Sequence, residues 1–185
     1  MMDKESYDIL VDKIGSSTDN ILVINNFLTE EECDLIVNNL NTKTALSLTG
    51  FWENRIFSEF SFPKECKSIL KKYRIKSHAQ VKKIYGDTLL ANSMNQHIVK
   101  WPEGPGMEEH IDDEAKERSH YHIASVLYLN DNYDGGEINF PQHNLSIKPK
   151  KGDLLIFPGN QNYAHEVKEI LSGERFTAPG WYRFL

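Results

Sequence analysis

Short apolar and β-branched runs alternate with Gly, Pro and Asn along the second half of the chain. Between residues 122 and 185 they occur as the segments HIASVLYLN, DGGEINFP, NLSIKP, DLLIFP, AHEVKEI, ERFTAP and GWYRFL. Several short strands at this spacing, separated by turn residues, are typical of a β-sandwich or barrel. The pattern therefore predicts a double-stranded β-helix, or jelly roll, in this half.

The first half has a mixed pattern. The apolar run at 21–25 predicts a strand. Residues 28–40 predict a helix, because Thr29 and Glu32 have the spacing of a capping box and apolar residues follow at helical intervals. Pro63 is well placed to begin a second helix. The expected fold is α+β and mainly β, with N-terminal helices packed on one sheet of the jelly roll.

Length and composition narrow the class of protein. A chain of 185 residues fits one domain, for which we expect a helical and mixed part at 1–88 and a jelly-roll core with the metal site at 89–185. The formal net charge of −6 and scattered basic residues predict no nucleic-acid partner. No apolar run approaches the roughly 18 residues of a membrane span. Cys33 and Cys66 form no CxxC motif, which favours reduced thiols in the cytoplasm. Nothing in the pattern specifies an oligomeric state.

Candidate chemistry centres on MEEHIDDE, where His110 precedes Asp112 by two positions. In a strand such residues share a face, so they could both reach one ion. Taken alone, the pair is more simply interpreted as a solvated acidic loop. His165 follows an apolar strand, where a hydrogen-bonded histidine at the sheet edge is the alternative. Arg175 begins another predicted strand, where a surface ion pair is the alternative.

Together these four residue types indicate a specific kind of site. Two histidines and one carboxylate can occupy one face of an octahedral Fe(II) ion and leave three positions open. An arginine offers a planar fork that binds a carboxylate with two hydrogen bonds. The combination suits an iron centre that binds a bidentate keto acid.

The chain resembles the Fe(II)/2-oxoglutarate-dependent dioxygenases, specifically the prolyl 4-hydroxylase-like branch. The resemblance covers most of the chain and rests on several motifs in the right order. These are ILVINNFLTEEECDLI, HID, VLYLNDNYDGGEINFP, IKPKKGDLLIFPG and HEVKEILSGERFTAPGW.

The resemblance implies roles for particular residues. His110, Asp112 and His165 would bind the iron, and Arg175 would bind the outer carboxylate of 2-oxoglutarate, where many relatives use Lys. Trp181 matches a tryptophan near the substrate cleft. The chain departs from the family pattern at four positions. Relatives have Tyr, Tyr and a hydroxyl residue where this chain has Trp101, Met107 and Ile138. They have Arg where it has Tyr121 or His122, depending on the alignment. Trp101 is thus a candidate cofactor-binding residue, and Met107, Tyr121 and Trp181 are candidate substrate-binding residues.

The function implied is hydroxylation of a C–H bond with O2 and 2-oxoglutarate, which leaves succinate and CO2. We expect a peptide or protein side chain as substrate, with proline as one candidate. A small-molecule or free amino-acid hydroxylase of the same family is an alternative, and a degenerate, non-catalytic metal-binding jelly roll is another. A cupin-like zinc hydrolase could use the same three ligands. Arg175 argues against it, because hydrolysis does not need a carboxylate fork.

Overall fold

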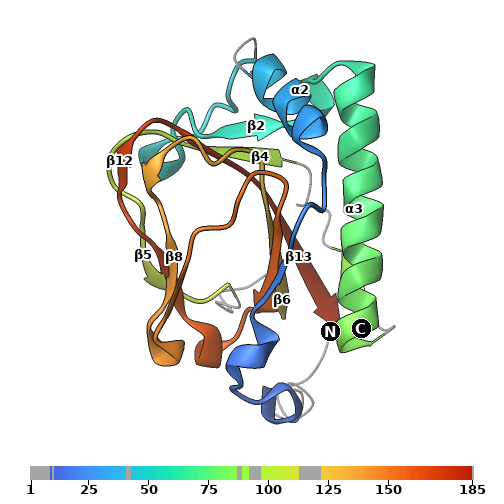
Figure 1. Cartoon of the computed structure of the whole chain (residues 1–185), viewed down its shortest axis with the longest axis vertical. Helices are drawn as coiled ribbons and strands as arrows, with labels where there is room; N and C mark the ends of the chain where they lie inside the picture. Colours follow the sequence, from blue (N-terminus) through green and yellow to red (C-terminus); the bar gives the residue numbers. More distant parts are fainter. Residues whose placement is uncertain are drawn as a thin grey trace.

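Two antiparallel sheets face each other in the protein (Figure 1). The computed structural model describes residue 9 and residues 11–40, 43–86, 89–91, 97–112 and 122–184, with only the backbone of 89–91. In these residues the larger sheet has the order β1(Leu22–Ile24), β10(Leu154–Pro158), β6(Ile123–Tyr128), β13(Arg175–Phe184), β4(His97–Trp101), β2(Ile56–Ser58), with β3(Leu89–Ala91) also on β13.

The smaller sheet supplies the opposite wall. Its order is β5(Met107–His110), β11(His165–Val167), β8(Ile138–Phe140), β9(Leu145–Ile147). A separate two-stranded sheet pairs β12(Ile170–Ser172) with β7(Asp134–Gly135). Short 3-10 turns lie at Thr18–Asn20, Gly50–Trp52, Glu59–Ser61, Pro141–His143 and Gln161–Tyr163.

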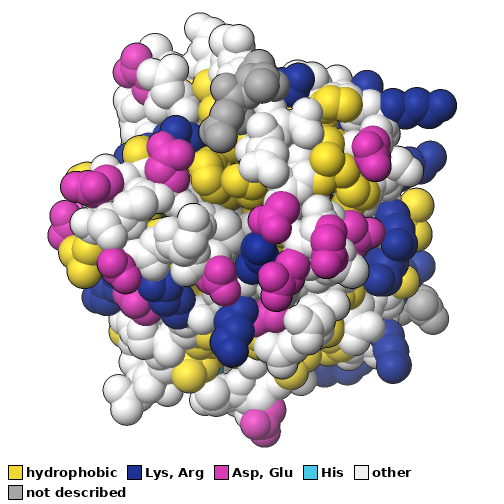
Figure 2. All heavy atoms as spheres, turned by 45° about the horizontal axis from the view of Figure 1, so that its top comes forward, with side chains coloured by type: hydrophobic (Ala, Val, Ile, Leu, Met, Phe, Trp, Pro, Cys, Tyr) yellow, Lys and Arg dark blue, Asp and Glu magenta, His cyan; other side chains and the backbone are white. Residues whose placement is uncertain are grey.

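Helices α2(Glu30–Leu40) and α3(Lys64–Tyr85) pack on the outer face of the larger sheet (Figure 1). The predicted capping box is present at the start of α2. The Glu32 amide donates to Oγ1 of Thr29 over 3.2 Å, and the Thr29 amide donates to the Glu32 carboxylate over 3.1 Å. Pro63 precedes α3 as predicted. Lysines recur along the exposed face of α3, and dark blue side chains line the right-hand edge of Figure 2, on the side where α3 lies in Figure 1.

One prediction about the strands was wrong. ERFTAP and GWYRFL are not two strands but one, β13, which continues through Pro179 and Gly180. Strand β6 pairs with β13 from Thr177 to Tyr182, whereas on the other edge β4 pairs only up to Thr177 and β3 only from Tyr182. Pro179 therefore lies where that edge lacks a strand partner in the described chain, a position that tolerates a residue without an amide hydrogen.

Two apolar cores hold these layers together. One lies between the helices and the larger sheet, where Cys33, Ile36, Tyr73 and Ile98 are fully buried. The other lies between the two sheets around residues such as Phe140. This arrangement confirms the predicted jelly-roll architecture with helices on one sheet. Among the described residues, no helix is long and apolar enough to cross a membrane.

Candidate metal centre and co-substrate pocket

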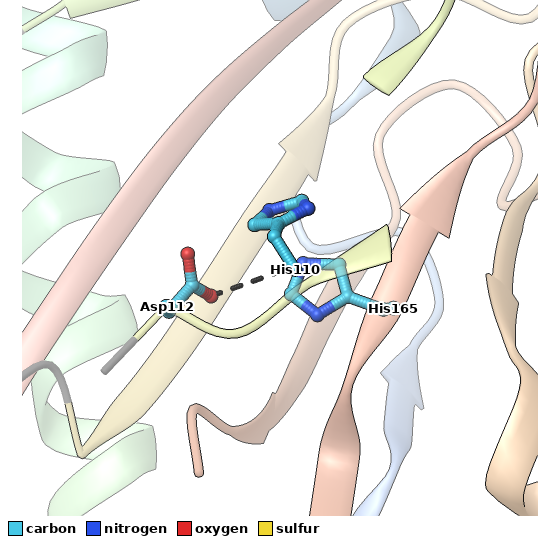
Figure 3. A group of neighbouring side chains, drawn as sticks. All are labelled: His110, Asp112 and His165. Carbon is cyan, nitrogen blue, oxygen red and sulfur yellow. Dashed lines mark ion pairs between the residues drawn. The ribbon is translucent and has the colours of Figure 1, made fainter. Parts of the chain in front are cut away.

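Two side chains from the smaller sheet and one from the turn after β5 converge on one point (Figure 3). His165 begins β11 and lies directly opposite His110, the last residue of β5, in the antiparallel register. Their rings are 4.4 Å apart between centroids. The sequence suggested that Asp112 lies in the same strand as His110. The structure places Asp112 in the turn just after β5 instead. Its Oδ2 is still 4.0 Å from Nε2 of His165, and the ligand atoms of all three residues lie within 4.8 Å of one another.

Both imidazoles are oriented by backbone carbonyls. Nδ1 of His110 lies 2.8 Å from the Glu108 carbonyl, and Nδ1 of His165 lies 3.1 Å from the Tyr163 carbonyl. A carbonyl oxygen can only accept a hydrogen bond, so Nδ1 carries the proton in both rings. In the neutral form of each ring, Nε2 is then the atom free to bind a metal ion, as in metal-binding histidines.

The environment of His165 favours its neutral form. Burial lowers the pKa of His165, and His110 acts in the same direction, while Asp112 partly opposes both. A neutral imidazole is the form that binds a metal ion, and metals compete with protons for it. Two imidazoles and one carboxylate fit Fe(II) well, because they cover one face and leave open positions.

Trp181 lies against the same carboxylate. Its Nε1 donates a hydrogen bond to Oδ1 of Asp112 over 3.0 Å, so the two oxygens of Asp112 have different neighbours. The indole also packs against the ring of His97, with 5.6 Å between centroids. The sequence suggested a substrate contact for Trp181. The structure places it on the cavity wall and adds a bond to a metal-ligand candidate.

Arg175 is the first residue of β13 and lies opposite Trp101 of the neighbouring strand β4. The side chain is 2% exposed, and its guanidinium carbon lies 5.0 Å from the Trp101 ring and 4.9 Å from the Tyr128 ring. Nη2 donates to the Tyr128 hydroxyl over 3.1 Å. Nε and Nη1 are buried and have no hydrogen-bond partner among the described residues. A buried, unpaired guanidinium N–H is costly, so this fork is suited to an anionic ligand.

Two tyrosines beside Arg175 were not singled out from the sequence. The Tyr128 hydroxyl accepts from Arg175, and the Tyr133 hydroxyl is buried without a partner in the described chain. Burial raises the pKa of Tyr133 to about 12, with Arg175 acting in the opposite direction. Tyr133 and Arg175 both lie against Gly136, where an added Cβ would be 3.1 Å from one and 3.3 Å from the other. A phenol near a buried arginine is only recognisable once the strands are paired.

The metal-ligand candidates and Arg175 share one cavity of about 750 Å³ between the sheets, and the two tyrosines lie behind Arg175, outside its lining. Its wall includes the three metal-ligand candidates, Arg175, and the predicted residues Trp101, Met107 and Trp181. Trp101 uses its indole N–H on Thr177, so its contact with Arg175 is made by the ring face. Tyr121, predicted near the substrate, lies outside the described residues.

Residues 94–183 match the model of the family described as the 2OG-Fe(II) oxygenase superfamily. That range contains the His–Asp–His group and Arg175. This range, just under half of the chain, matches that superfamily by sequence. The family resemblance inferred from the motifs is confirmed, and the iron and 2-oxoglutarate of the superfamily's name are the two groups that the donor set and the arginine fork suit.

Similar proteins are hydroxylases by name. A PKHD-type hydroxylase of Prochlorococcus marinus (strain MIT 9301) is 32% identical over 117 residues, which cover 62% of this chain and 49% of that protein. A PKHD-type hydroxylase of Parvibaculum lavamentivorans is 32% identical over 92 residues, or 48% of this chain and 41% of that protein. The chain spans about half the length of these curated relatives.

Solved structures share the fold. The viral collagen prolyl hydroxylase of Paramecium bursaria Chlorella virus-1, in its 2OG complex, has a TM-score of 0.70 at 21% identity and covers 92% of this chain and 98% of its own. A Trichoplax adhaerens prolyl hydroxylase, in complex with a hypoxia inducible factor peptide fragment, has a TM-score of 0.66 at 18% identity. The match covers 98% of this chain and 94% of that one. At these identities the likeness establishes the jelly-roll fold.

Proposed function

We propose that this protein is an Fe(II)- and 2-oxoglutarate-dependent oxygenase that hydroxylates a C–H bond of a peptide or protein side chain, with proline as one candidate. The observation that carries the proposal is the buried Arg175 fork in the same cavity as His110, Asp112 and His165. The balance is one O2 and one 2-oxoglutarate consumed per C–H bond, with succinate, CO2 and one C–OH bond as products.

Each residue has a distinct task in this proposal. His110, Asp112 and His165 hold the iron, which when bound supplies the oxygen chemistry. Arg175 binds the outer carboxylate of 2-oxoglutarate, with Tyr128 orienting the guanidinium and Tyr133 adding a donor. Trp101 closes one side of the arginine and helps to exclude water from it. All of this lies in one jelly-roll domain that includes the N-terminal helices.

Two rival functions are disfavoured by the same pocket. A zinc hydrolase with these ligands would have no use for a buried arginine with two unpaired N–H groups. A degenerate binding module would not need both a complete ligand set and a carboxylate fork. A peptide substrate is supported by the names of relatives and by the peptide bound to the Trichoplax neighbour. Buried free thiols at Cys33 and Cys66 support a reducing compartment such as the cytoplasm.

The test begins with anaerobic titration of the metal-free protein with Fe(II) and then with 2-oxoglutarate. We expect one equivalent of each to bind, with 2-oxoglutarate requiring the metal. Oxygen is then admitted with peptides, proteins or free amino acids, and succinate and a 16-Da mass gain are measured as about equal amounts. A protein that binds the metal but makes no succinate with any substrate would be a binding module, and metal-dependent hydrolysis would favour the zinc enzyme.

A further inference from the structure

Several large apolar side chains that line the cavity are also exposed to solvent. Leu46, Leu48 and Phe60 are 43%, 41% and 69% exposed, and all three line the cavity together with the half-buried Trp52. We refer to these four residues as the apolar shelf. Most exposed apolar residues in a protein are scattered, whereas a cluster at the edge of a cavity indicates a binding surface.

Hydrogen bonds and aromatic contacts hold part of the apolar shelf against the larger sheet. The Leu46 amide donates to the Ile56 carbonyl of β2 over 2.8 Å, which ties this segment to the sheet. Phe51 packs edge-on against Trp52 with 4.9 Å between ring centroids, and the Arg55 guanidinium lies 4.1 Å from the Phe51 ring. Trp52 in turn lies 6.0 Å from Trp101, the tryptophan beside Arg175. An aromatic series therefore connects the shelf to the co-substrate pocket.

Charge is scarce along this cavity. Of the described residues that line it, only Asp112 and Arg175 carry a formal charge apart from histidines. Both are committed in the proposed function, one to iron and the other to 2-oxoglutarate. A free amino acid would bring an ammonium group and a carboxylate into a wall whose described residues offer no further charged side chain besides histidine to pair with them. Burial of unpaired charges is strongly unfavourable.

The size of the cavity leaves room for more than the co-substrate. About 750 Å³ is within the range of about 300–1,000 Å³ that holds drug-sized ligands. Iron and a five-carbon keto acid, held by the ligand candidates and Arg175, would fill only part of this volume and leave the exposed shelf side chains free. Because the shelf residues and the metal-ligand candidates line one cavity, a molecule that covers the shelf can also reach the metal centre.

We propose that the apolar shelf binds a bulky apolar side chain that neighbours the hydroxylated residue within a peptide chain. This inference rests on the proposed function and specifies its substrate: an uncharged internal segment with Leu, Met, Phe or Trp near the target residue. The shelf selects such segments by apolar burial, and it selects against free amino acids because they lack the neighbouring side chain and carry two charges.

The test uses binding without turnover. Protein loaded with Mn(II) and 2-oxoglutarate under anaerobic conditions is equilibrated with a pool of acetylated and amidated peptides, randomised on both sides of a central residue that is itself varied. Bound peptides are identified by mass spectrometry. We expect bulky apolar residues to be enriched about tenfold over Ser, Asp and Lys at one flanking position. Leu48→Ser and Phe60→Ser should reduce this enrichment to near parity.

Matched controls lie elsewhere on the surface. Leu171 and Ile75 are 63% and 61% exposed and do not line the cavity, so Leu171→Ser and Ile75→Ser should keep the wild-type enrichment. Equal enrichment in the shelf variants, a preference for charged neighbours, or tighter binding of free amino acids would each overturn the proposal. A dimer in sedimentation that Phe60→Ser dissociates would instead assign the shelf to a second copy of the chain.

The two proposals fail in different ways. Succinate production by the wild-type protein tests the oxygenase function and does not depend on which peptide is preferred. Peptide enrichment tests the shelf and does not depend on turnover. Succinate formation without apolar enrichment would refute only the proposal about the shelf. Apolar enrichment without succinate formation would refute the oxygenase function and indicate a peptide-binding protein.

Discussion

The indole Nε1 of Trp181 donates a hydrogen bond to Oδ1 of Asp112 over 3.0 Å. Asp112 lies in the turn after β5, beyond the regular strand, so the backbone ladder does not hold its side chain. Trp181, in the long strand β13 of the opposite sheet, supplies that restraint. The bond leaves Oδ2 on the side of His165, at 4.0 Å from Nε2, where a shared metal ion would be bound.

Trp181→Phe removes this donor and keeps an aromatic ring on the wall. We expect the affinity for Fe(II) to fall about tenfold or more, because residues that orient a metal ligand contribute 10–100-fold to affinity. Anaerobic calorimetry measures the change. Trp52→Phe is the matched control, since Trp52 lines the cavity without a bond to a ligand candidate, and it should bind Fe(II) as the wild type does. Unchanged affinity in Trp181→Phe would remove the positioning role.

The three ligand candidates should be needed individually. His110→Ala, Asp112→Ala and His165→Ala should each weaken Fe(II) binding by more than about 100-fold, since the loss of a direct ligand exceeds that of an orienting residue. His143→Ala is a fair control, because His143 stacks on Tyr163 and bonds to the Asn162 carbonyl outside the site. Circular dichroism should show that all four variants are folded. Wild-type affinity in any of the three would exclude that residue as a ligand.

Arg175 and Tyr133 should act on 2-oxoglutarate rather than on iron. Arg175→Ala should raise the dissociation constant of 2-oxoglutarate about tenfold or more, at roughly 1.4 kcal/mol per decade, and Arg175→Lys should raise it less because the charge remains. Tyr133→Phe should raise it about fivefold, from the loss of one hydrogen bond of about 1 kcal/mol.

Calorimetry on the Mn(II)-loaded protein measures the dissociation constant of 2-oxoglutarate for each variant in the absence of turnover. Tyr85→Phe serves as the control, because the Tyr85 hydroxyl already donates to the Asn20 carbonyl, whereas the Tyr133 hydroxyl is buried without a partner in the described chain and its ring lies near Arg175. A change in Mn(II) affinity that accounts for the whole loss would show that these variants disturb the metal centre instead. An unchanged constant for Arg175→Ala would leave the pocket without its carboxylate-binding residue.

The cysteines should be unreactive in the folded protein. Burial raises the pKa of Cys33 to about 12 and also raises that of Cys66. A raised pKa lowers the thiolate fraction at pH 8, and the thiolate is the reactive form. A colorimetric thiol titration should therefore detect almost no reaction before denaturation and both thiols after it. Rapid reaction of a native thiol would contradict this burial.

Several features of this protein were readable from local sequence. The spacing of Thr29 and Glu32 predicted the start of α2, because a capping box depends only on residues within one turn. Turn residues divided the second half into strands, since Gly and Pro act on the backbone where they stand. The order of His110, Asp112, His165 and Arg175 in recognisable motifs indicated the family, which the comparisons confirmed.

Other features were decided only by tertiary structure. Pro179 stays within β13 because of which strands pair on each edge, and that pairing joins segments far apart in the chain. His165 faces His110 because of the register between β11 and β5. The bond from Trp181 to Asp112 and the unpaired N–H groups of Arg175 depend on both sheets closing over one cavity. Local propensity acts within a few residues, whereas burial and side-chain contact depend on long-range packing, so only the folded chain shows them.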